Sequence, residues 1–440
     1  MHVLFIAGYE LGHQPLHVAG PAGRVRAAGH EARAIDLSMQ SWDPDLVDWA
    51  DRIAISVPMH TAARLARRAI EAIRQQRADV AICAYGLYAP TLADVADRTI
   101  AGETDVAILA WVDHEPRRGV HTVHLDRTAA TPGAPLPARD LLPALDRYAH
   151  LAIGDDERPV AYIEASHGCA HRCRHCPVPV VYDGRIRLVA VDDVLADVAQ
   201  VVGSGARHVT FGDPDFLNGI HHSLRVARAV HSRFPDLTFD CTVTVEHILW
   251  HADTWPALAD LGCGFVVSAF EPTNDTVLER LDKGHTAADA ARAVELLRDH
   301  AIEIRPTWLP FTPWTTFDDV RDLLRFVAHH DLVPNVDPVQ YTIRLLIPKG
   351  SLLLDLPDVL TRVASYDDIR QTYPWRAQDP RIDDLQVALA ALVEGHLAAG
   401  TPIPAVFRAV CDAAGVDWDP ASLPAGSVEG RPRLTEPWFC

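Results

Sequence analysis

The amino-acid sequence predicts an α/β protein in which a doubly wound parallel sheet of the Rossmann type precedes a partial (β/α)6 TIM-type barrel and a helical C-terminal region. Two series of short apolar runs alternate with amphipathic, alanine-rich stretches, and a proline-containing stretch without a sustained period separates them. The 440 residues suffice for two or three domains with cores of ordinary size. We therefore expect an N-terminal domain at 1–125, a surface linker at 126–158, a barrel at 159–360 and a C-terminal extension at 361–440.

The first series has the rhythm of a parallel sheet that is covered on both faces. Strands are expected in VLFIAG (3–8), EARAIDL (31–37), RIAISV (52–57) and DVAICAYGLYA (79–89). The helical stretches PAGRVRAAGH and TAARLARRAIEAIRQQ lie between strands. Because parallel strands need crossover connections, this βαβ order places helices on both faces of the sheet.

The second series contains six candidate strands, which favour a partial barrel over an open sheet. They are VAYIEA (160–165), HVTFG (208–212), TFDCTVTV (238–245), GFVVSAF (264–270), EIRPTW (303–308) and VQYTIRLLI (339–347). Beyond them, DDLQVALAALVEGHLAAG predicts a helix in the C-terminal extension.

Composition limits the classes of partner. The formal net charge of −19 disfavours binding to nucleic-acid phosphates. The N-terminal segment has no basic region, and no stretch approaches the roughly 20 apolar residues of a membrane span. We therefore expect a cytoplasmic protein that contacts neither nucleic acid nor membrane.

Three of the eight cysteines lie together in one loop. Cys169, Cys173 and Cys176 have the spacing C-x3-C-x2-C directly after a predicted strand, and Gly168 and Pro177 bracket them. Thiolates are the ligands of iron-sulfur clusters, and a cubane with three protein ligands leaves one iron open. The spacing therefore predicts a catalytic cluster at the end of a barrel strand, where barrel active sites are built.

Two alternatives remain for this loop. His167, His171 and His175 interleave with the cysteines, so a Cys3His zinc site or a non-catalytic redox module is possible from the residue types alone. A purely structural cluster is the second alternative. The isolated cysteines need no such role and are expected to be small buried hydrophobes; they are Cys83, Cys241, Cys263 and Cys411.

The loop resembles that of the radical S-adenosylmethionine (SAM) superfamily, and the resemblance extends over roughly 160 to 350. It implies that Cys169, Cys173 and Cys176 hold a 4Fe-4S cluster whose open iron is chelated by SAM. A reductant such as flavodoxin or ferredoxin would then supply one electron, and cleavage of a C–S bond would usually give a 5'-deoxyadenosyl radical. The implied substrate is a small molecule or a peptide, and the cofactors carry the difficult chemistry.

The resemblance also implies which residues contact SAM. The family ends its second barrel strand with glycine and acidic residues, here in FGDPDF, and its fourth strand with Ser or Glu, here in SAFE, before a Lys-Gly pair, Lys283-Gly284. The implied contacts are Gly212, Asp213, Asp215, Ser268 and Glu271. Alternatively the two aspartates cap a helix, and Glu271 and Lys283 are solvated. Candidate catalytic residues are Glu246, Arg305 and Cys440.

The N-terminal domain resembles the cobalamin-binding domain that precedes the barrel in one radical SAM subfamily. The segments AISVPMHTAARLARRAIEAIR and AYGLYAP fall where that fold lines its cleft, but the cobalt-ligating motif D-x-H-x-x-G is absent. Cobalamin bound without a protein axial ligand, and hence a cobalamin-dependent radical methyltransferase, is one alternative. A docking or substrate-shaping role of the domain is another.

The whole-chain pattern most resembles the CUAEP/CCAEP-tail radical SAM proteins, on segments such as DLLPALDRYA, CPVPVVYDGR and PRLTEPWFC. Those proteins end in Cys, then selenocysteine or Cys, then Ala-Glu-Pro. Our hypothesis is that a UGA codon follows Cys440, and the alternative is a plain terminal cysteine. A soft thiol–selenol pair would suit transfer of the 3-amino-3-carboxypropyl group of SAM to a thiophilic acceptor such as trivalent arsenic.

Overall fold

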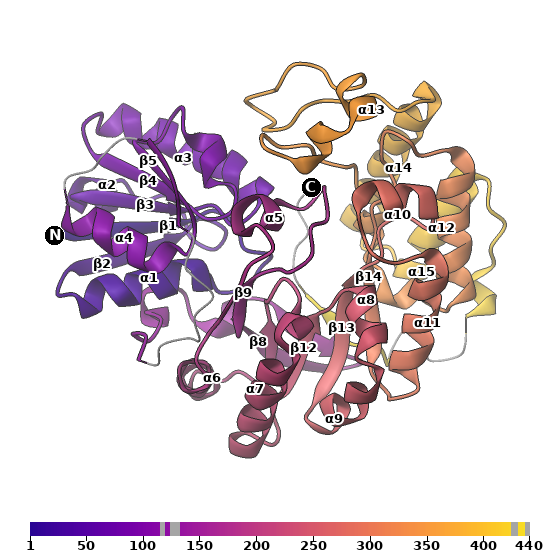
Figure 1. Cartoon of the computed structure of the whole chain (residues 1–440), viewed down its shortest axis with the longest axis horizontal. Coiled ribbons are helices and arrows are strands. Elements are labelled where there is room, and N and C mark those ends of the chain that lie inside the picture. Colours follow the sequence, from indigo (N-terminus) through magenta and orange to yellow (C-terminus); the bar gives the residue numbers. More distant parts are fainter. Residues whose placement is uncertain (115–118, 124–132, 424–429, 436–440) are drawn as a thin grey trace.

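A computed structural model of the chain describes residues 1–114, 119–123, 133–423 and 430–435. Figure 1 shows two α/β bodies side by side, with the N-terminal sheet in indigo and purple and a curled sheet in magenta to orange. The C-terminal helices, in yellow, pack on the outside of the second body. The predicted fold class is confirmed.

The N-terminal sheet has six parallel strands in the order β2-β1-β3-β4-β5-β6. The strands are β1 (His2–Ala7), β2 (Glu31–Asp36), β3 (Arg52–Ser56), β4 (Ala81–Tyr85), β5 (Arg98–Gly102) and β6 (Gly119–Val123). The helices are α1 (Leu16–Ala27), α2 (Pro44–Trp49), α3 (His60–Gln76) and α4 (Thr104–Asp113). The first four strands are those expected, whereas β5 and β6, short and partly polar, were not foreseen.

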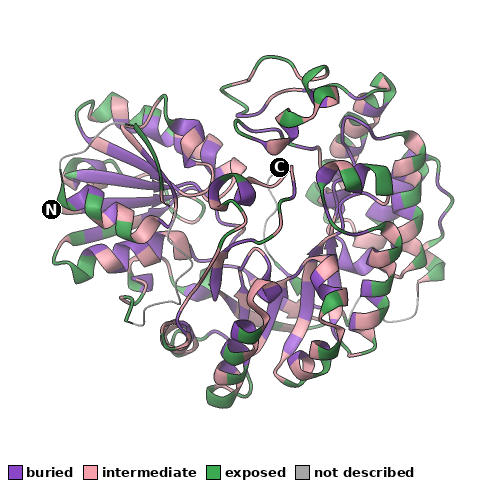
Figure 2. Ribbon diagram, viewed as in Figure 1, coloured by how far each residue is buried: buried purple, intermediate pink, exposed green. Residues whose placement is uncertain are grey.

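Alternation along the buried strands divides the core of this domain into two layers. Phe5 packs with residues of α1 and α4 on one face, and its neighbour Ile6 packs with residues of α3 on the other. Successive side chains of a strand point to opposite faces, so a strand buried on both faces reads as one apolar run. Figure 2 shows the buried strands between helices whose outer faces are exposed.

The second sheet has seven strands in the order β14-β13-β12-β11-β8-β7-β15. Five are parallel and form the half-barrel: β8 (Asp156–Ile163), β11 (His208–Phe211), β12 (Thr238–Thr242), β13 (Cys263–Ala269) and β14 (Glu303–Thr307). The helices around it are α6 (Val191–Gly203), α7 (Ile220–Arg233), α8 (Val245–Trp250), α9 (Trp255–Asp260), α10 (Asp275–Leu281), α11 (Ala287–Arg298) and α12 (Phe317–His329).

The sixth barrel strand expected at 339–347 does not form in the described structure. A 3-10 turn spans Pro338–Thr342, and a single parallel bridge joins Phe311 to Arg344. Pro306 lies inside β14, so its edge lacks an N–H donor at that position. The Gln340 side chain accepts the backbone N–H of Trp308 at 3.0 Å, so a side chain takes the place of a strand partner.

In the described part of the stretch expected to be a surface linker, residues 133–158, several side chains are buried. This stretch ends in an antiparallel hairpin of β7 (His150–Ile153) with β8. Before the hairpin, the buried guanidinium of Arg139 donates at 2.8 Å to each carboxylate oxygen of Asp197 on α6. Tyr148 donates to Asp36 of the first domain at 3.0 Å. These buried contacts join the two domains.

The C-terminal region returns to the barrel sheet. The expected helix is α14 (Pro380–Ala398), a second helix α15 (Ile403–Ala414) follows it, and β15 (Arg433–Leu434) pairs with β7. The remaining elements are β9 (Ser166–Gly168), β10 (Ile186–Leu188), α5 (Pro177–Tyr182) and α13 (Pro357–Leu360). None of the helices in the described part of the chain is long and apolar enough to cross a membrane.

Candidate active site at the carboxyl end of the half-barrel

The three-cysteine loop lies between β9 and α5, at the carboxyl end of the first barrel strand β8. Cys169 and Cys173 are buried, Cys176 is partly buried, and none of the three is in a disulfide. Gly168 opens the loop with φ +78°, and a Cβ there would lie 2.3 Å from the carbonyl oxygen of Arg185. Only glycine fits this position, so the backbone fixes where the loop begins.

Burial makes these thiols weak acids. It raises the pKa of Cys169 to about 11 and that of Cys176 to about 12. The buried ammonium of Lys283 acts in the opposite direction on Cys173 and Cys176. Since thiolates are the metal-binding form, a bound metal must supply positive charge that replaces the thiol protons.

Each of the three histidines in β9 and the loop is turned toward a carboxylate. His167 lies 3.0 Å from Glu103, His171 3.4 Å from Asp215 and His175 3.0 Å from Glu271, measured between ring nitrogen and oxygen.

The structure therefore does not assemble the Cys3His alternative. Within the described ranges, one group of three metal-ligating side chains converges, and it contains no cysteine. A zinc ion needs its ligands around one point, whereas thiolates of a cubane bind different iron atoms.

Gly212 and Asp213, at the end of β11, face the base of the loop. A Cβ at Gly212 would lie 1.8 Å from the Tyr162 ring, so the position requires glycine. Buried Asp213 accepts hydrogen bonds from the Ser166 hydroxyl and from the Ala165 N–H. Burial raises the pKa of Asp213 to about 7. Its carboxylate holds the start of the loop.

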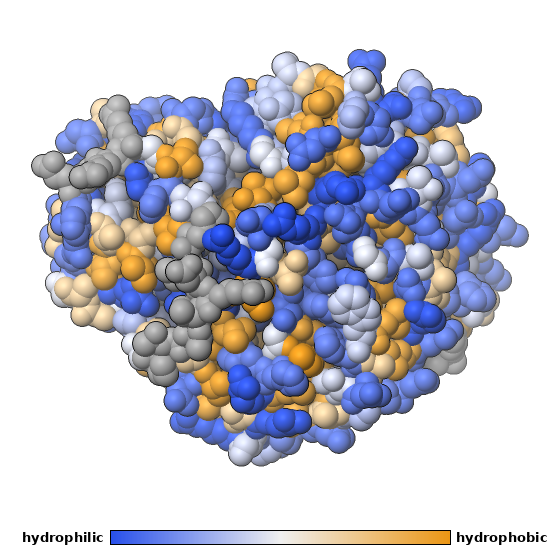
Figure 3. Space-filling model, in the orientation of Figure 1, coloured by the Kyte–Doolittle hydropathy of each residue, from blue (hydrophilic) through white to orange (hydrophobic). Residues whose placement is uncertain are grey.

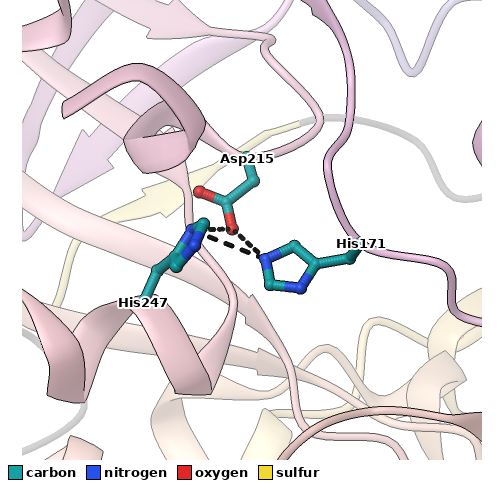
Figure 4. Close-up of side chains that lie close together, drawn as sticks. All are labelled: His171, Asp215 and His247. Carbon is teal, nitrogen blue, oxygen red and sulfur yellow. Dashed lines mark hydrogen bonds and ion pairs between the residues drawn. The ribbon is translucent and has the colours of Figure 1, made fainter. Parts of the chain in front are cut away.

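Asp215 is fully buried between the loop and α8 (Figure 4). Its Oδ2 lies 2.9 Å from Nδ1 of His247 and 3.4 Å from Nε2 of His171, and it accepts from Thr244 N–H and hydroxyl at 3.1 and 2.8 Å. Oδ1 accepts the N–H of Leu217 at 2.9 Å, so Asp215 also caps a 3-10 turn. Burial opposes ionisation, but these partners hold the pKa of Asp215 far below its usual range.

Glu271 and Lys283 form a buried ion pair beside the loop. Glu271 adopts a left-handed conformation, φ +60°, and its Oε1 lies 3.4 Å from Nζ of Lys283. Burial would raise the pKa of Glu271, but Lys283 and His175 outweigh it and hold the pKa at about 2. Ser268 is fully buried, and its hydroxyl has no hydrogen-bond partner among the described residues. The alternative in which Glu271 and Lys283 are solvated is wrong, because both side chains are buried.

The three candidate catalytic residues are not brought together. Glu246 lies at the loop, with Oε2 3.3 Å from Nδ1 of His171. Arg305 instead donates to Asp337 at 2.6 Å and to the carbonyl of Pro432 at 3.0 Å, toward the C-terminal segment. Cys440 lies outside the described residues.

A cavity of about 570 Å³ separates the two domains next to the loop. From the first domain, Ser56, Tyr85 and Gly102 at the ends of β3, β4 and β5 line it. Gly168 and Gly212 line it from the barrel side. Open α/β sheets bind ligands outside the carboxyl ends of their strands, which is the edge that faces this cavity.

A chain of alternating carboxylates and imidazoles crosses this interface. His17 lies 3.0 Å from Glu10 and 3.2 Å from Glu164. His167 lies 3.2 Å from the other oxygen of Glu164 and 3.0 Å from Glu103. Glu10, His17 and Glu103 come from the first domain, and the other two come from the barrel. We call these five residues the interdomain chain.

Mutual pairing sets the charges of the interdomain chain. Burial lowers the pKa of His17, but Glu164 and Glu10 outweigh it and raise the pKa well above its usual value. Burial likewise opposes ionisation of Glu103, but His167 and Arg187 hold its pKa at about 2. Sequence reasoning named His167 only as a possible zinc ligand and missed the other four members, because they are scattered along the chain. Glu103 and Glu164 directly follow β5 and β8, but β5 was not foreseen and Glu164 fell inside the predicted strand 160–165.

Comparison with known proteins identifies the barrel. Residues 163–327 match the family model of the Radical SAM superfamily. The second domain is a radical SAM domain. The ribosomal protein uS12 methylthiotransferase RimO of Porphyromonas gingivalis is 25% identical over 189 residues, which are 39% of this chain and 41% of that protein. The chain thus spans less than half the length of the curated relatives it matches.

Two solved structures share the wider architecture. OxsB, a cobalamin-dependent SAM radical enzyme solved with aqua-cobalamin, aligns with a TM-score of 0.70 and 13% identity over 90% of this chain and 67% of its own. The radical SAM methyltransferase TsrM from Kitasatospora setae aligns with a TM-score of 0.59 and 15% identity over 75% and 73%. At such identities the likeness establishes the fold, an N-terminal parallel sheet followed by the radical SAM half-barrel.

The half-barrel at residues 163–327 therefore carries the radical SAM domain, and this superfamily implies a 4Fe-4S cluster and SAM as cofactors. Buried hydrogen-bond donors beside the loop are suited to contact these cofactors. Asn218 accepts the N–H of Ala170 at 3.1 Å, yet its Nδ2 has no hydrogen-bond partner in the described part of the chain. The same holds for Nδ1 of His175. Buried donors are rarely left unsatisfied, so a polar group is expected next to them.

Proposed function

We propose that this enzyme cleaves SAM reductively at a 4Fe-4S cluster held by Cys169, Cys173 and Cys176, and uses the fragment on a small molecule or peptide. The observation that carries the proposal is the place of the three-thiol loop. It lies at the carboxyl end of the first barrel strand, and Gly168, directly before Cys169, lines the interdomain cavity. A substrate in that cavity would lie beside the loop.

The chain's own residues have distinct parts in this proposal. When bound, the cluster supplies an electron and an open iron for SAM. The buried ammonium of Lys283 stabilises negative charge on Cys173 and Cys176, and Glu271 holds Lys283 in place. The unpaired donors of Asn218 and Ser268 are proposed to hydrogen-bond the cofactors. Asp213 and Asp215 are proposed to position the loop and not to contact SAM, because protein groups already form hydrogen bonds with their carboxylates.

Product analysis tests the proposal. The protein is reconstituted with iron and sulfide without oxygen, reduced with dithionite and incubated with SAM. Mass spectrometry is expected to find 5'-deoxyadenosine with the wild type and none with Cys173→Ala. Methylthioadenosine in its place would indicate transfer of the 3-amino-3-carboxypropyl group. If a protein with an intact cluster forms neither 5'-deoxyadenosine nor methylthioadenosine, the proposal is contradicted.

A second candidate is a cobalamin-dependent radical methyltransferase, favoured by the position of the cavity between two domains arranged as in OxsB and TsrM. The residues that line the cavity fit cobalamin only in part. His13 and His17 follow β1 and line the cavity, but the D-x-H-x-x-G motif is absent and Tyr85 donates to the His17 carbonyl at 2.9 Å. Incubation with hydroxocobalamin and desalting tests it, and less than a tenth of an equivalent of cobalt per chain would argue against this candidate.

Membership of the CUAEP/CCAEP-tail subgroup is a finer proposal, which rests on motifs such as CPVPVVYDGR and GDPDFLNG. Sequencing the gene beyond the codon of Cys440 tests it. A UGA or Cys codon followed by Ala-Glu-Pro codons supports the subgroup, and any other continuation contradicts it.

A further inference from the structure

Three side chains converge with the spacing of metal ligands, one from the three-cysteine loop and two from neighbouring elements (Figure 4). Nδ1 of His247 lies 2.9 Å from Oδ2 of Asp215, Nε2 of His171 lies 3.4 Å from the same oxygen, and the two nitrogens are 3.5 Å apart. Three ligands about 2.1 Å from one metal ion at angles between octahedral and tetrahedral would be roughly 3.0–3.4 Å apart. The observed distances are close to that range.

The three donors come from separate elements and are withdrawn from solvent. His171 belongs to the cluster loop, Asp215 follows β11, and His247 lies in the first turn of α8. The side chain of Asp215 is 0% exposed, and those of His171 and His247 are 14% and 10% exposed. Tertiary folding alone brings them together, since 44 residues separate the first from the second and 32 separate the second from the third.

Glu246 supplies an independent indication. Its carboxylate lies 3.3 Å from Nδ1 of His171, the ring nitrogen on the side away from the trio. Metal-ligating histidines almost always donate this second nitrogen to a carboxylate or carbonyl, which fixes the tautomer and turns the other nitrogen to the metal. With neutral imidazoles, Asp215 and Glu246 also give the site two negative charges, which match a divalent cation.

We propose that His171, Asp215 and His247 bind a divalent transition-metal ion of the Zn²⁺ class, separate from the cysteine-bound cluster. Two imidazoles and one carboxylate form the ligand set of catalytic zinc and of non-haem Fe(II). Three protein ligands leave at least one coordination place open. A substrate oxygen or nitrogen, or water, is the class of ligand that would fill it.

Hydrogen bonds from Thr244 to the proposed ligand atoms support an alternative in which no metal is bound. Thr244 donates its hydroxyl to Asp215 at 2.8 Å, and its Oγ1 lies 3.2 Å from Nε2 of His171. The backbone N–H of Thr244 also donates to Asp215 at 3.1 Å. A metal-free hydrogen-bond cluster that only fixes the loop would use the same atoms. The experiment must therefore count metal and not activity.

The probe is Zn²⁺ added to the reconstituted, cluster-containing protein without oxygen, followed by desalting. We expect about one zinc per chain in the wild type with iron and sulfide unchanged, because the trio and the cysteines are separate sites. His247→Ala is expected to lose the zinc and keep the cluster. His251→Ala, which removes a histidine one turn further along the same segment, is the matched control and is expected to keep both.

Two further measurements keep the outcome decisive. Glu246→Gln leaves all three ligands in place and is expected to weaken zinc binding by roughly 10–100-fold. Zinc-edge X-ray absorption is expected to show nitrogen and oxygen at about 2.0–2.2 Å and no sulfur at about 2.3 Å. Zinc retained equally by His247→Ala, a sulfur shell, or no zinc in a wild type with an intact cluster would each overturn the proposal. Loss of the cluster in the wild type would instead count against the proposed function.

Discussion

The two ends of the half-barrel are both rich in buried charge, but they use different residues. Toward the amino ends of the strands arginines predominate: Arg431 donates to Asn335 at 2.7 Å and to the carbonyl of Asp331 at 2.9 Å, and Arg305 in the middle of β14 pairs with Asp337. One buried histidine, His208 at the start of β11, pairs with Asp240 at this end. At the carboxyl ends most partners of the carboxylates are histidines, joined by Lys283 on Glu271 and by Arg187 on Glu103. The first end closes the barrel with the C-terminal segment, whereas the second carries the cysteine loop.

The difference between the two ends follows from the chemistry of the cations. Arginine stays charged and presents a planar fork of donors, so its pairs suit permanent closure. Histidine changes charge near neutral pH, ligates metals and offers two distinct nitrogens. A fold can therefore bury charge at both ends and still reserve one end for chemistry. The predictions below test this separation.

The largest effect is expected from Cys173→Ala. Loss of one of three thiolate ligands should abolish cluster assembly and SAM cleavage while leaving the fold intact, because Cys173 packs as a small side chain at the loop. Iron and sulfide content, product formation and circular dichroism measure these outcomes. Cys83→Ala, in the core of the first domain, is the matched control and should keep the cluster. A fully active Cys173→Ala variant would refute the cluster assignment.

Arg305→Ala should act on the opposite end and affect stability. Removing one partner of a buried ion pair leaves Asp337 without its charge partner, and we expect a loss of about 3–5 kcal/mol in the free energy of unfolding. Urea denaturation measures it, with the exposed Arg292→Ala as control. The cluster content of the protein that stays folded should be normal. If Arg305→Ala instead removed SAM cleavage at unchanged stability, Arg305 would be catalytic.

Glu103→Gln should weaken the junction between the domains. Glu103 is buried and accepts from His167 and Arg187, and hydrogen bonds to charged groups contribute about 1.5–3 kcal/mol each. We expect a loss of about 2 kcal/mol in unfolding free energy and greater protease sensitivity between the domains. Glu394→Gln on the exposed face of α14 is the control, and an equal change in both variants would mean that the junction does not depend on Glu103.

The smallest effect is a pH dependence that arises from His17. Its pKa is raised above 6.5 in the folded state, so the stability that its charge contributes is present below about 6.5 and is lost as pH rises through the folded pKa. The wild type should therefore lose more stability than His17→Gln between about pH 6 and about pH 9. Urea midpoints at the two pH values measure it, and identical slopes would contradict the pairing of His17 with Glu10 and Glu164.

Local patterns carried most of the correct predictions. Apolar runs such as 3–8 and 264–270 identified strands because a strand buried on both faces is apolar throughout. The sixth barrel strand at 339–347 was predicted by the same rule and did not form. Its apolar side chains instead pack into the core from a segment without regular secondary structure. A single parallel bridge, between Phe311 and Arg344, is formed there. Composition cannot distinguish these outcomes, because both bury the same side chains.

The sequence by itself determined the cysteine loop and its place after a barrel strand, because three thiols within eight positions are close in any fold. Only the tertiary structure decided what surrounds the loop. Glu103 meets His167 across 64 residues, and Asp215 meets His247 across 32 residues. Such pairs leave no local pattern, since each partner stands alone among unrelated neighbours. They form because parallel strands deliver their carboxyl ends to one edge, where the side chains that follow each strand converge.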